Sequence, residues 1–108
     1  MSAYYHLKPS GTQYMFNLKE GGNGQVVLTS ERYTTKQGAH TGIASVKANS
    51  PYDVRYERRT NTAGFPYFVL KGGNGEVIGT SEAYSSTAAR DNGIAWVKAN
   101  APSAPTRE

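Results

Sequence analysis

The sequence contains no cysteine, and this absence excludes both disulfide bonds and thiolate metal sites. A chain without cysteine is compatible with the reducing cytosol, and we expect a cytoplasmic protein. No run of about 18 apolar residues is present, so we expect no membrane-spanning segment and no membrane partner. The first residues, Met1 to Tyr5, also lack the basic region and apolar run of a signal peptide.

Histidine is scarce, which limits the catalytic and metal sites that the chain can form. Only His6 and His40 are present, and neither has a His, Cys or carboxylate at ligand spacing on a predicted common element. Ser30, His40 and Asp53 could be drawn as a triad. The second half of the chain has Asp91 in place of His40, however, and no nucleophile elbow presents the serine. We therefore expect no metal site, no cofactor and no enzymatic activity.

The sequence contains a tandem repeat of one unit. Residues 21–51 are GGNGQVVLTSERYTTKQGAHTGIASVKANSP, and residues 72–102 are GGNGEVIGTSEAYSSTAARDNGIAWVKANAP. Pairing each residue from Asn23 to Pro51 with the residue 51 positions later gives 15 identities in 29 pairs. Such a match is far beyond chance, so both copies should adopt the same fold.

The length of 108 residues fits one small domain. Each copy alone would bury too little surface to be more than marginally stable, so the repeats at 1–51 and 52–102 should share one core. We therefore predict a single domain over residues 1–102. The tail, residues 103–108, has no large apolar side chain, and we expect it to be disordered.

In the first repeat, apolar and polar residues alternate over 3–8 and 13–19, which predicts two strands. Asn23-Gly24 is typical of a tight hairpin turn and should lead into a return strand at 25–30. The apolar spacing then changes to that of a helix. We predict this helix over 35–48, with Thr34 as its N-cap and Gln37 completing a capping box.

The second repeat follows the same plan. We predict strands over 52–58, 66–70 and 76–81, and a helix that starts after Ser85 and ends near Asn100. In the first strand, the alternation predicts that Tyr52, Val54 and Tyr56 pack on the core. In the helix, Ile94 and Val97 should face inward, and replacing Arg90 should cost little stability. The predicted class is α+β, with two tandem βββα repeats that form one antiparallel-rich sheet with both helices on one face.

A family likeness rests on Phe16-x-Leu18, Asn23-Gly24-x-Val26, Ser30-Glu31-x-Tyr33 and Gly42-Ile43-x-Ser45-Val46-Lys47-x-Asn49, and on their counterparts from Phe68 to Asn100. This combination resembles the YegP-like family of small bacterial proteins of unknown function. The resemblance covers nearly the whole chain. It implies a tandem β(3)-α repeat assembled as a pseudodimer, with the helices exchanged between repeats, and it carries over no activity, cofactor or catalytic residue.

The glycines invite two interpretations. The paired GGNG loops could cradle a phosphate, but a phosphate loop leads into a helix N-terminus, and these loops lead into predicted strands. We therefore interpret them as hairpin turns. Gly42 and Gly93 lie inside the predicted helices, where each costs about 0.5 to 1 kcal/mol relative to Ala. Close packing explains them better than contact with a ligand.

Aromatic and basic residues supply the candidate sites. Tyr33 and Tyr84 precede the helices, and they could either anchor the helix start by packing or line a groove. Tyrosine and arginine also mix at Tyr52, Arg55, Tyr56, Arg58 and Arg59. Such a mixture on a sheet can stack on bases and hold phosphates. Alternation divides it between two faces, which favours a solvated charged face over a tyrosine-rich core.

Two functional hypotheses follow. The leading one is a small non-enzymatic structural or interaction module with an unidentified protein partner, which exists as a monomer with internal pseudo-twofold symmetry. The alternative is a weak, salt-sensitive nucleic-acid-binding protein, because 12 basic residues against 8 acidic ones give a net charge of +4. Its candidate contact surface comprises Arg55, Arg58, Arg59 and the partly exposed Trp96.

Overall fold

The computed structural model describes residues 3–108, which form three strands and a helix, twice over, and a short C-terminal strand. The strands are β1 (Ala3–Ser10), β2 (Gln13–Glu20), β3 (Val26–Thr29), β4 (Tyr56–Thr60), β5 (Pro66–Lys71), β6 (Val77–Ser81) and β7 (Thr106–Arg107). The helices are α1 (Lys36–Asn49) and α2 (Thr87–Asn100), each followed by a short 3₁₀ helix, η1 (Asp53–Arg55) and η2 (Ala101–Ser103). The predicted α+β class with tandem βββα repeats is confirmed.

The strands form one sheet in the order β4-β5-β6-β3-β2-β1-β7. Neighbouring strands are antiparallel, except that β7 runs parallel to β1. The two repeats meet where β3 pairs with β6, through Leu28 with Ser81 and Thr29 with Thr80. Because Thr29 and Thr80 are equivalent positions of the two repeats, the pseudo-twofold axis passes between them.

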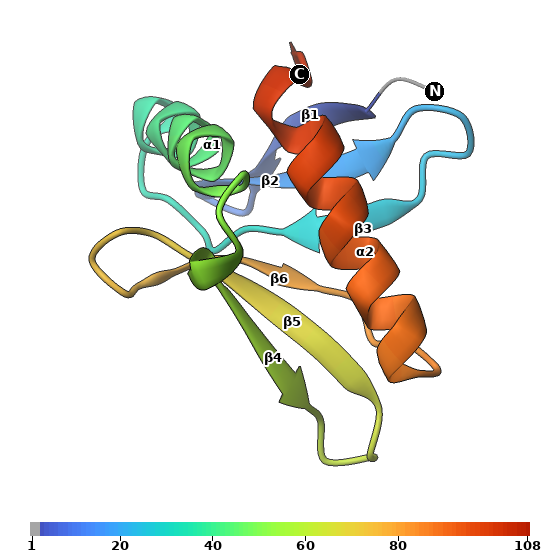
Figure 1. Cartoon of the computed structure of the whole chain (residues 1–108). Coiled ribbons are helices and arrows are strands. Elements are labelled where there is room, and N and C mark those ends of the chain that lie inside the picture. Colours follow the sequence, from blue (N-terminus) through green and yellow to red (C-terminus); the bar gives the residue numbers. More distant parts are fainter. Residues whose placement is uncertain (1–2) are drawn as a thin grey trace.

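Both helices lie on one face of the sheet (Figure 1). α1 contacts β1 and β2 of its own repeat and also β5 and β6 of the other, whereas α2 contacts β5 of its own repeat. α1 therefore spans the seam between the repeats. These contacts do not confirm the exchange of helices that the family resemblance implies, and that exchange stays a prediction.

A single core lies between the helices and the sheet and takes side chains from both repeats. Its large members are Tyr5, Leu7, Phe16, Leu18, Leu28, Ile43, Val46, Tyr56, Phe68, Leu70, Ile94 and Val97. At the seam the repeats differ. Leu28 leans over Gly79, its counterpart in the second repeat, so closely that a Cβ at Gly79 would lie 2.6 Å from Cδ2 of Leu28. One leucine therefore fills the space where two equivalent side chains would otherwise meet.

The helix N-caps lie one residue beyond the predicted ones. The Thr35 hydroxyl, rather than that of Thr34, accepts a 2.9 Å hydrogen bond from the Gly38 amide. In the second repeat Ser86, rather than Ser85, accepts a 3.0 Å bond from the Ala89 amide. Each cap belongs to a pair of adjacent hydroxyl residues, and the residue with extended backbone takes the role.

The predicted strand over 52–58 is wrong in its first half. Asp53–Arg55 forms η1, and β4 begins only at Tyr56. Tyr52 and Val54 are consequently 58% and 81% exposed, whereas Tyr56 is buried as predicted. The physical reason is that the chain must turn sharply after α1 to enter the far edge of the sheet, and the 3₁₀ turn takes up the residues that would have extended the strand.

The expectation that Arg90 contributes little to stability does not take account of its burial. Its position corresponds to the fully buried Ala39 of α1, four residues before Ile94 and hence on the same side of the helix. The side chain is only 12% exposed, and its Nε donates a 3.1 Å hydrogen bond to Oδ1 of Asp91. Arg90 therefore covers the core with its aliphatic stem rather than lying free on the surface.

The prediction of a disordered tail over residues 103–108 is also wrong. Ala104 is buried, and β7 pairs with β1 through Tyr5 with Thr106 and His6 with Arg107. The amide of Tyr5 donates a 2.8 Å hydrogen bond to the carbonyl oxygen of Pro105. Small residues and prolines form little core of their own, but here they cover the outer edge of a strand that is already formed, so composition alone was misleading.

Candidate functional site

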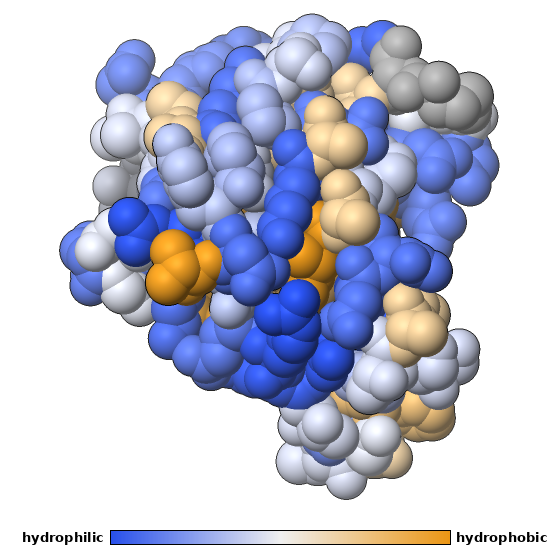
Figure 2. Space-filling view, in the orientation of Figure 1, coloured by the Kyte–Doolittle hydropathy of each residue, from blue (hydrophilic) through white to orange (hydrophobic). Residues whose placement is uncertain are grey.

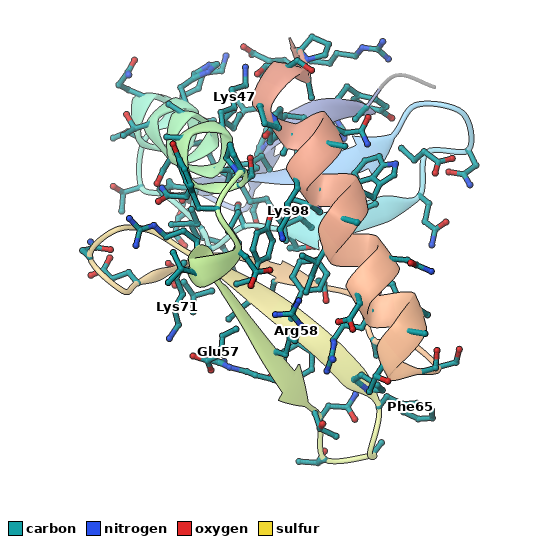
Figure 3. All side chains as sticks on the ribbon, viewed as in Figure 1. Lys47, Glu57, Arg58, Phe65, Lys71 and Lys98 are labelled. Carbon is teal, nitrogen blue, oxygen red and sulfur yellow. The ribbon has the colours of Figure 1, made fainter. Side chains whose placement is uncertain are left out.

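The candidate contact surface is divided among different environments. Arg55 lies in η1, and its Nε donates a 2.9 Å hydrogen bond to Oδ1 of Asn49. Arg58 lies on the helix face of the sheet, because its cross-strand partner is the buried Phe68. Its Nε donates a 3.1 Å bond to Oδ1 of Asp91 in α2 (Figure 3). The neighbouring residue, Arg59, points to the opposite face.

Carboxylates neutralise the charges on the helix face. Nη2 of Arg58 lies 3.5 Å from Oδ1 of Asp53, and Nζ of Lys98 donates a 2.8 Å bond to the same oxygen. The bond from Lys98 is the main reason that the pKa of Asp53 lies below its ordinary value, and the bond from Arg58 lowers the pKa of Asp91. The guanidinium of Arg58 and the ammonium of Lys98 are thus both held by carboxylates.

On the opposite face of β4, one carboxylate holds two cations. Glu57 accepts hydrogen bonds from Lys71 and from Arg59, and these bonds lower the pKa of the Glu57 carboxyl. Figure 3 shows Glu57 and Lys71 close together on β4 and β5, away from Arg58. Trp96, on α2, is partly buried and packs against the core, as the sequence allowed. Arg58 and Arg59 thus share no face, and the four residues of the candidate surface do not form one patch.

Tyr33 and Tyr84 pack on the glycines of the helices. A Cβ added at Gly42 would lie 2.3 Å from the Tyr33 hydroxyl oxygen, and one at Gly93 would lie 2.3 Å from that of Tyr84. Each ring also stacks on a core phenylalanine, Tyr33 on Phe16 and Tyr84 on Phe68, with 6.2 Å between the ring centroids in both pairs. Burial raises the pKa of both tyrosines. These contacts support packing as their role, and the groove stays a prediction.

The structure reveals a surface that sequence reasoning did not find, on the side of the sheet opposite the helices. We call this side the open face. Within residues 3–108 both α-helices lie on the other side, and strand alternation directs every second side chain here. One transverse row runs across it through the register of all seven strands: Arg107, His6, Asn17, Thr29, Thr80, Val69 and Glu57. The alternation of residues in β1 and β2 could have indicated this open face from the sequence. The contribution of the tail, through β7, could not have been predicted in this way.

The half of the open face formed by the first repeat is positively charged. We call its residues Tyr4, His6, Lys8, Asn17, Lys19 and Arg107 the basic face. Within the part of the chain that the structure describes, Lys8, Lys19 and Arg107 form no ion pair. The Arg107 guanidinium instead lies 4.4 Å from the centre of the Tyr4 ring. The three cations are therefore free to meet an anion.

The pKa of His6 reflects the positive charge of the basic face. Its Nδ1 lies 3.2 Å from Nζ of Lys19, which makes this nitrogen the acceptor and places the imidazole proton on Nε2. Burial lowers the pKa of His6, and the charges of Lys19 and Lys8 lower it further. In the second repeat the equivalent position is Glu57, an anion already held by two cations. The two halves of the open face thus differ in charge although their folds match.

Other site types find no support in the described residues. No group of three or more His, Cys, Asp or Glu among residues 3–108 could hold a metal ion. A shallow pocket at the end of β1 is lined by Leu7, Lys8, Pro9, Tyr14, Lys36 and Glu108, and neither Tyr33 nor Tyr84 belongs to it. No helix in the same range of residues is both long enough and apolar enough to cross a membrane.

The family follows from comparison with known proteins. Residues 10–57 and residues 61–108 each match the family described as Domain of unknown function (DUF1508). The chain belongs to this family. The two matches confirm the tandem repeat, and each DUF1508 unit begins at the second strand of a predicted repeat and extends past its helix. The second unit includes β7, which agrees with the ordered tail.

Full-length relatives of this DUF1508 chain confirm the resemblance to the YegP-like family. A UPF0339 protein of Bordetella pertussis is 60% identical over 108 residues, which is 100% of this chain and 96% of that protein. The UPF0339 protein YegP of Escherichia coli K12 is 46% identical over 109 residues, covering 100% of this chain and 98% of YegP. All of these relatives are bacterial.

Solved structures of DUF1508 relatives share the fold. The solution NMR structure of a UPF0339 protein from Shewanella oneidensis is similar with a TM-score of 0.90 at 50% identity, covering 99% of this chain and 91% of the other. The solution structure of YegP from E. coli, described as a protein of unknown function, has a TM-score of 0.89 at 46% identity, covering 99% and 92%. Both solved structures thus share the fold of this chain over 99% of its length.

Proposed function

We propose that this protein is a non-enzymatic interaction module that holds its partner against the open face of the sheet. The observation that carries the proposal is the group of cations at Lys8, Lys19 and Arg107, which form no ion pair within residues 3–108 and lie on the side opposite the helices. The helix face, by contrast, presents ion pairs between elements (Figure 3) and a mostly hydrophilic surface (Figure 2). Free charge on a flat surface favours recognition of an anionic partner.

The absence of catalytic activity is part of this proposal. A general acid and base must lie within reach of one substrate, and in this chain the carboxylates with lowered pKa values are held by cations. Asp53, Glu57, Asp91 and Glu108 are each paired with Lys or Arg. Most of these pairs link different segments of the chain, whereas Arg59 and Glu57 both lie in β4. A cytoplasmic location also belongs to the proposal, supported by a composition that needs no oxidising compartment.

The test is a native capture from a bacterial extract with three versions of the full chain. One is the wild type, one carries Lys8→Gln with Lys19→Gln on the open face, and the control carries Arg32→Gln with Lys47→Gln. Both variants lose the same charge, but Lys47 lies in α1 and Arg32 in the loop before it, and neither forms an ion pair within residues 3–108. The wild type and the control should retain the same macromolecule, and the open-face variant should lose it.

Equal retention by all three versions would show that the open face does not bind the partner. Circular dichroism and a thermal melt of each variant establish that it is folded before capture. Exposed substitutions of this kind usually change stability by less than about 0.5 kcal/mol.

A further inference from the structure

The cations of the basic face come from three neighbouring strands, β7, β1 and β2. Lys19 pairs across the strands with Tyr4, and Lys8 pairs with Met15, so their backbone positions are four residues, or about 13 Å, apart along β1. The Lys19 side chain reaches back toward His6, whose Nδ1 lies 3.2 Å from its Nζ, and the charge of Lys8 also acts on this histidine. Arg107 adds a third cation on the other side of β1. Positive charge therefore extends over three strands, and a chain of anions can contact more of it than a single phosphate ion can.

The groups between these cations suit nucleobases. The Tyr4 ring carries the Arg107 guanidinium at 4.4 Å, and a pair of this kind presents both a π face and a cation. His6 adds a second flat ring, and its accepting Nδ1 leaves Nε2–H as a donor. Bases stack on aromatic side chains that a sheet holds in place, and they offer acceptors to such donors. An acidic peptide or a lipid headgroup would contact the cations of the basic face but would not stack on the rings of Tyr4 and His6.

A single strand fits this face better than a duplex. Reading a duplex requires a helix or a ribbon that enters a groove, and the side chains here come from the sheet surface of β1, β2 and β7. Tyr4, His6, Lys8 and Lys19 are each only partly exposed. They can contact bases that are already unstacked but cannot reach base edges inside a helix.

We infer that the basic face binds single-stranded nucleic acid, with phosphates on Lys8, Lys19 and Arg107 and a base stacked on Tyr4. This inference rests on the proposed function and names its partner. It moves the nucleic-acid hypothesis away from Arg58 and Arg59, whose charges are already neutralised by Asp91 and Glu57.

The site is short, because the anion Glu57 occupies the position equivalent to His6 in the second repeat. Beyond the seam, a strand that crosses the first repeat meets Arg59 and Lys71, and the Glu57 carboxylate already holds both of these cations. About three phosphate contacts give a log–log dependence of affinity on salt of about −2 for a single strand. Affinity should be micromolar or weaker near physiological salt.

The experiment is fluorescence anisotropy with a labelled single-stranded oligonucleotide of eight mixed-sequence residues, titrated with the full-length protein from 20 to 200 mM salt. The wild type and the Arg32→Gln, Lys47→Gln control should bind within about twofold of each other. Lys8→Gln with Lys19→Gln should weaken binding by about tenfold or more at 20 mM salt and reduce the salt slope to about −0.7. Tyr4→Leu should weaken it roughly fivefold without changing the slope.

The competing occupants are tested with the duplex of the same sequence, with polyglutamate and with vesicles containing anionic lipid. Tightest binding to the single strand is the expected result. No binding of the oligonucleotide at 20 mM salt would overturn the inference, as would equal loss in the control, or polyglutamate or vesicles binding as tightly. If the capture from extract still depends on Lys8 and Lys19 while the oligonucleotide fails, the open face remains the interaction surface and nucleic acid is excluded as its occupant.

Discussion

The hydroxyl of Tyr5 donates a 2.7 Å hydrogen bond to the carbonyl oxygen of Ala101, a residue 96 positions later in the chain. The equivalent hydroxyl of Tyr56 donates a 2.7 Å bond to the carbonyl oxygen of Ser50. In each bond the tyrosine belongs to one repeat and the acceptor follows the helix of the other. Burial raises the pKa of both phenols, because a charged oxygen could not be solvated there. The pair of bonds links the two repeats symmetrically.

Tyr5→Phe should destabilise the protein by about 1 to 3 kcal/mol, because it leaves the carbonyl of Ala101 without its buried donor. Tyr56→Phe should cost a similar amount for the carbonyl of Ser50. Chemical denaturation followed by Trp96 fluorescence gives the free energy of unfolding. Tyr52→Phe is the matched control, since Tyr52 is 58% exposed, and it should change stability by less than about 0.5 kcal/mol. A cost for Tyr5→Phe as small as that of the control would contradict a role for this bond.

Gly42→Ala should destabilise the protein by about 1 to 3 kcal/mol although Ala is the better helix former. The new methyl group would meet the Tyr33 hydroxyl at 2.3 Å and force the ring off Phe16. Thermal melts of the single variant and of the double variant with Tyr33→Leu measure the effect. Because leucine at position 33 is smaller than tyrosine, the double variant should recover part of the stability that Gly42→Ala loses. A Gly42→Ala variant more stable than the wild type would show that the helix does not need the close approach.

Ile94→Ala should cost about 2 to 5 kcal/mol, because Ile94 is 1% exposed and its loss leaves a cavity in the shared core. Arg90→Ala should cost less than Ile94→Ala but more than Asn92→Ala, since the Arg90 stem covers the core and Asn92 is exposed. Denaturant midpoints rank the three variants. Equal midpoints for Arg90→Ala and Ile94→Ala would show that the arginine stem contributes as much to the core as the isoleucine.

The pKa of His6 should lie below the ordinary histidine value of about 6.5, and Lys19→Gln should move it upward. Near pH 6 the unfolded chain then binds more protons at this residue than the folded one. The His6 contribution to stability therefore falls as the pH is lowered through the ordinary value. An NMR titration of the imidazole protons measures the pKa, with Arg32→Gln as the control for a distant charge. A pKa above 6.5 would contradict the positive environment of the basic face.

Most of the fold could be predicted because the repeat and the apolar periods point to the same elements. The strands at β2, β3, β5 and β6 and both helices lie within two residues of their predicted bounds. The errors fall where tertiary geometry overrides local pattern. Alternation at 52–58 is real, but the turn from α1 to the sheet edge converts it into η1. The apolar-poor tail gains its order from β1, which its own sequence does not describe.

The candidate site was less predictable than the fold. Charge clustering along the sequence drew attention to Arg55, Arg58 and Arg59, whose partners come from α1, α2 and β4 itself. The free cations instead come from three separate segments, β1, β2 and β7. The β1–β2 hairpin brings Lys8 and Lys19 to one surface, and the strand order adds Arg107 from β7, which no local spacing encodes. Whether a given cation forms an ion pair depends on carboxylates that are distant in the sequence, so the unpaired cations could not be identified from the sequence.

Residues 52–108 alone should form a homodimer, but a less stable one than the full-length fold. The Ser50 acceptor of Tyr56 would be replaced by Ala101 of the second copy, so that bond can form again. At the seam, however, Gly79 would face Gly79 and leave empty the space that Leu28 fills. Sedimentation equilibrium and melts at two concentrations test the assembly, because dissociation and unfolding are one event. A folded monomer with a concentration-independent melt would refute the shared core.

Gly79→Val should have opposite effects in the two settings. In the full chain its side chain would collide with Leu28 and cost about 1 to 3 kcal/mol. In the dimer of residues 52–108 it would fill the void and raise the melting temperature. The same sign in both proteins would show that Leu28 and Gly79 are not complementary partners at the axis.

The bond between Tyr5 and Ala101 also sets an order of events during synthesis. Tyr5 leaves the ribosome early, and its acceptor is made 96 residues later. At about 5 to 20 residues per second, roughly 5 to 20 seconds separate the two. Throughout that interval the outer edge of β1 has neither β7 nor η2 beside it, so the first repeat emerges with an unpaired strand edge. The nascent chain can pair the outer edge of β1 only after Thr106 and Arg107 have left the ribosome, whereas all of the residues of the β1–β2 hairpin emerge much earlier.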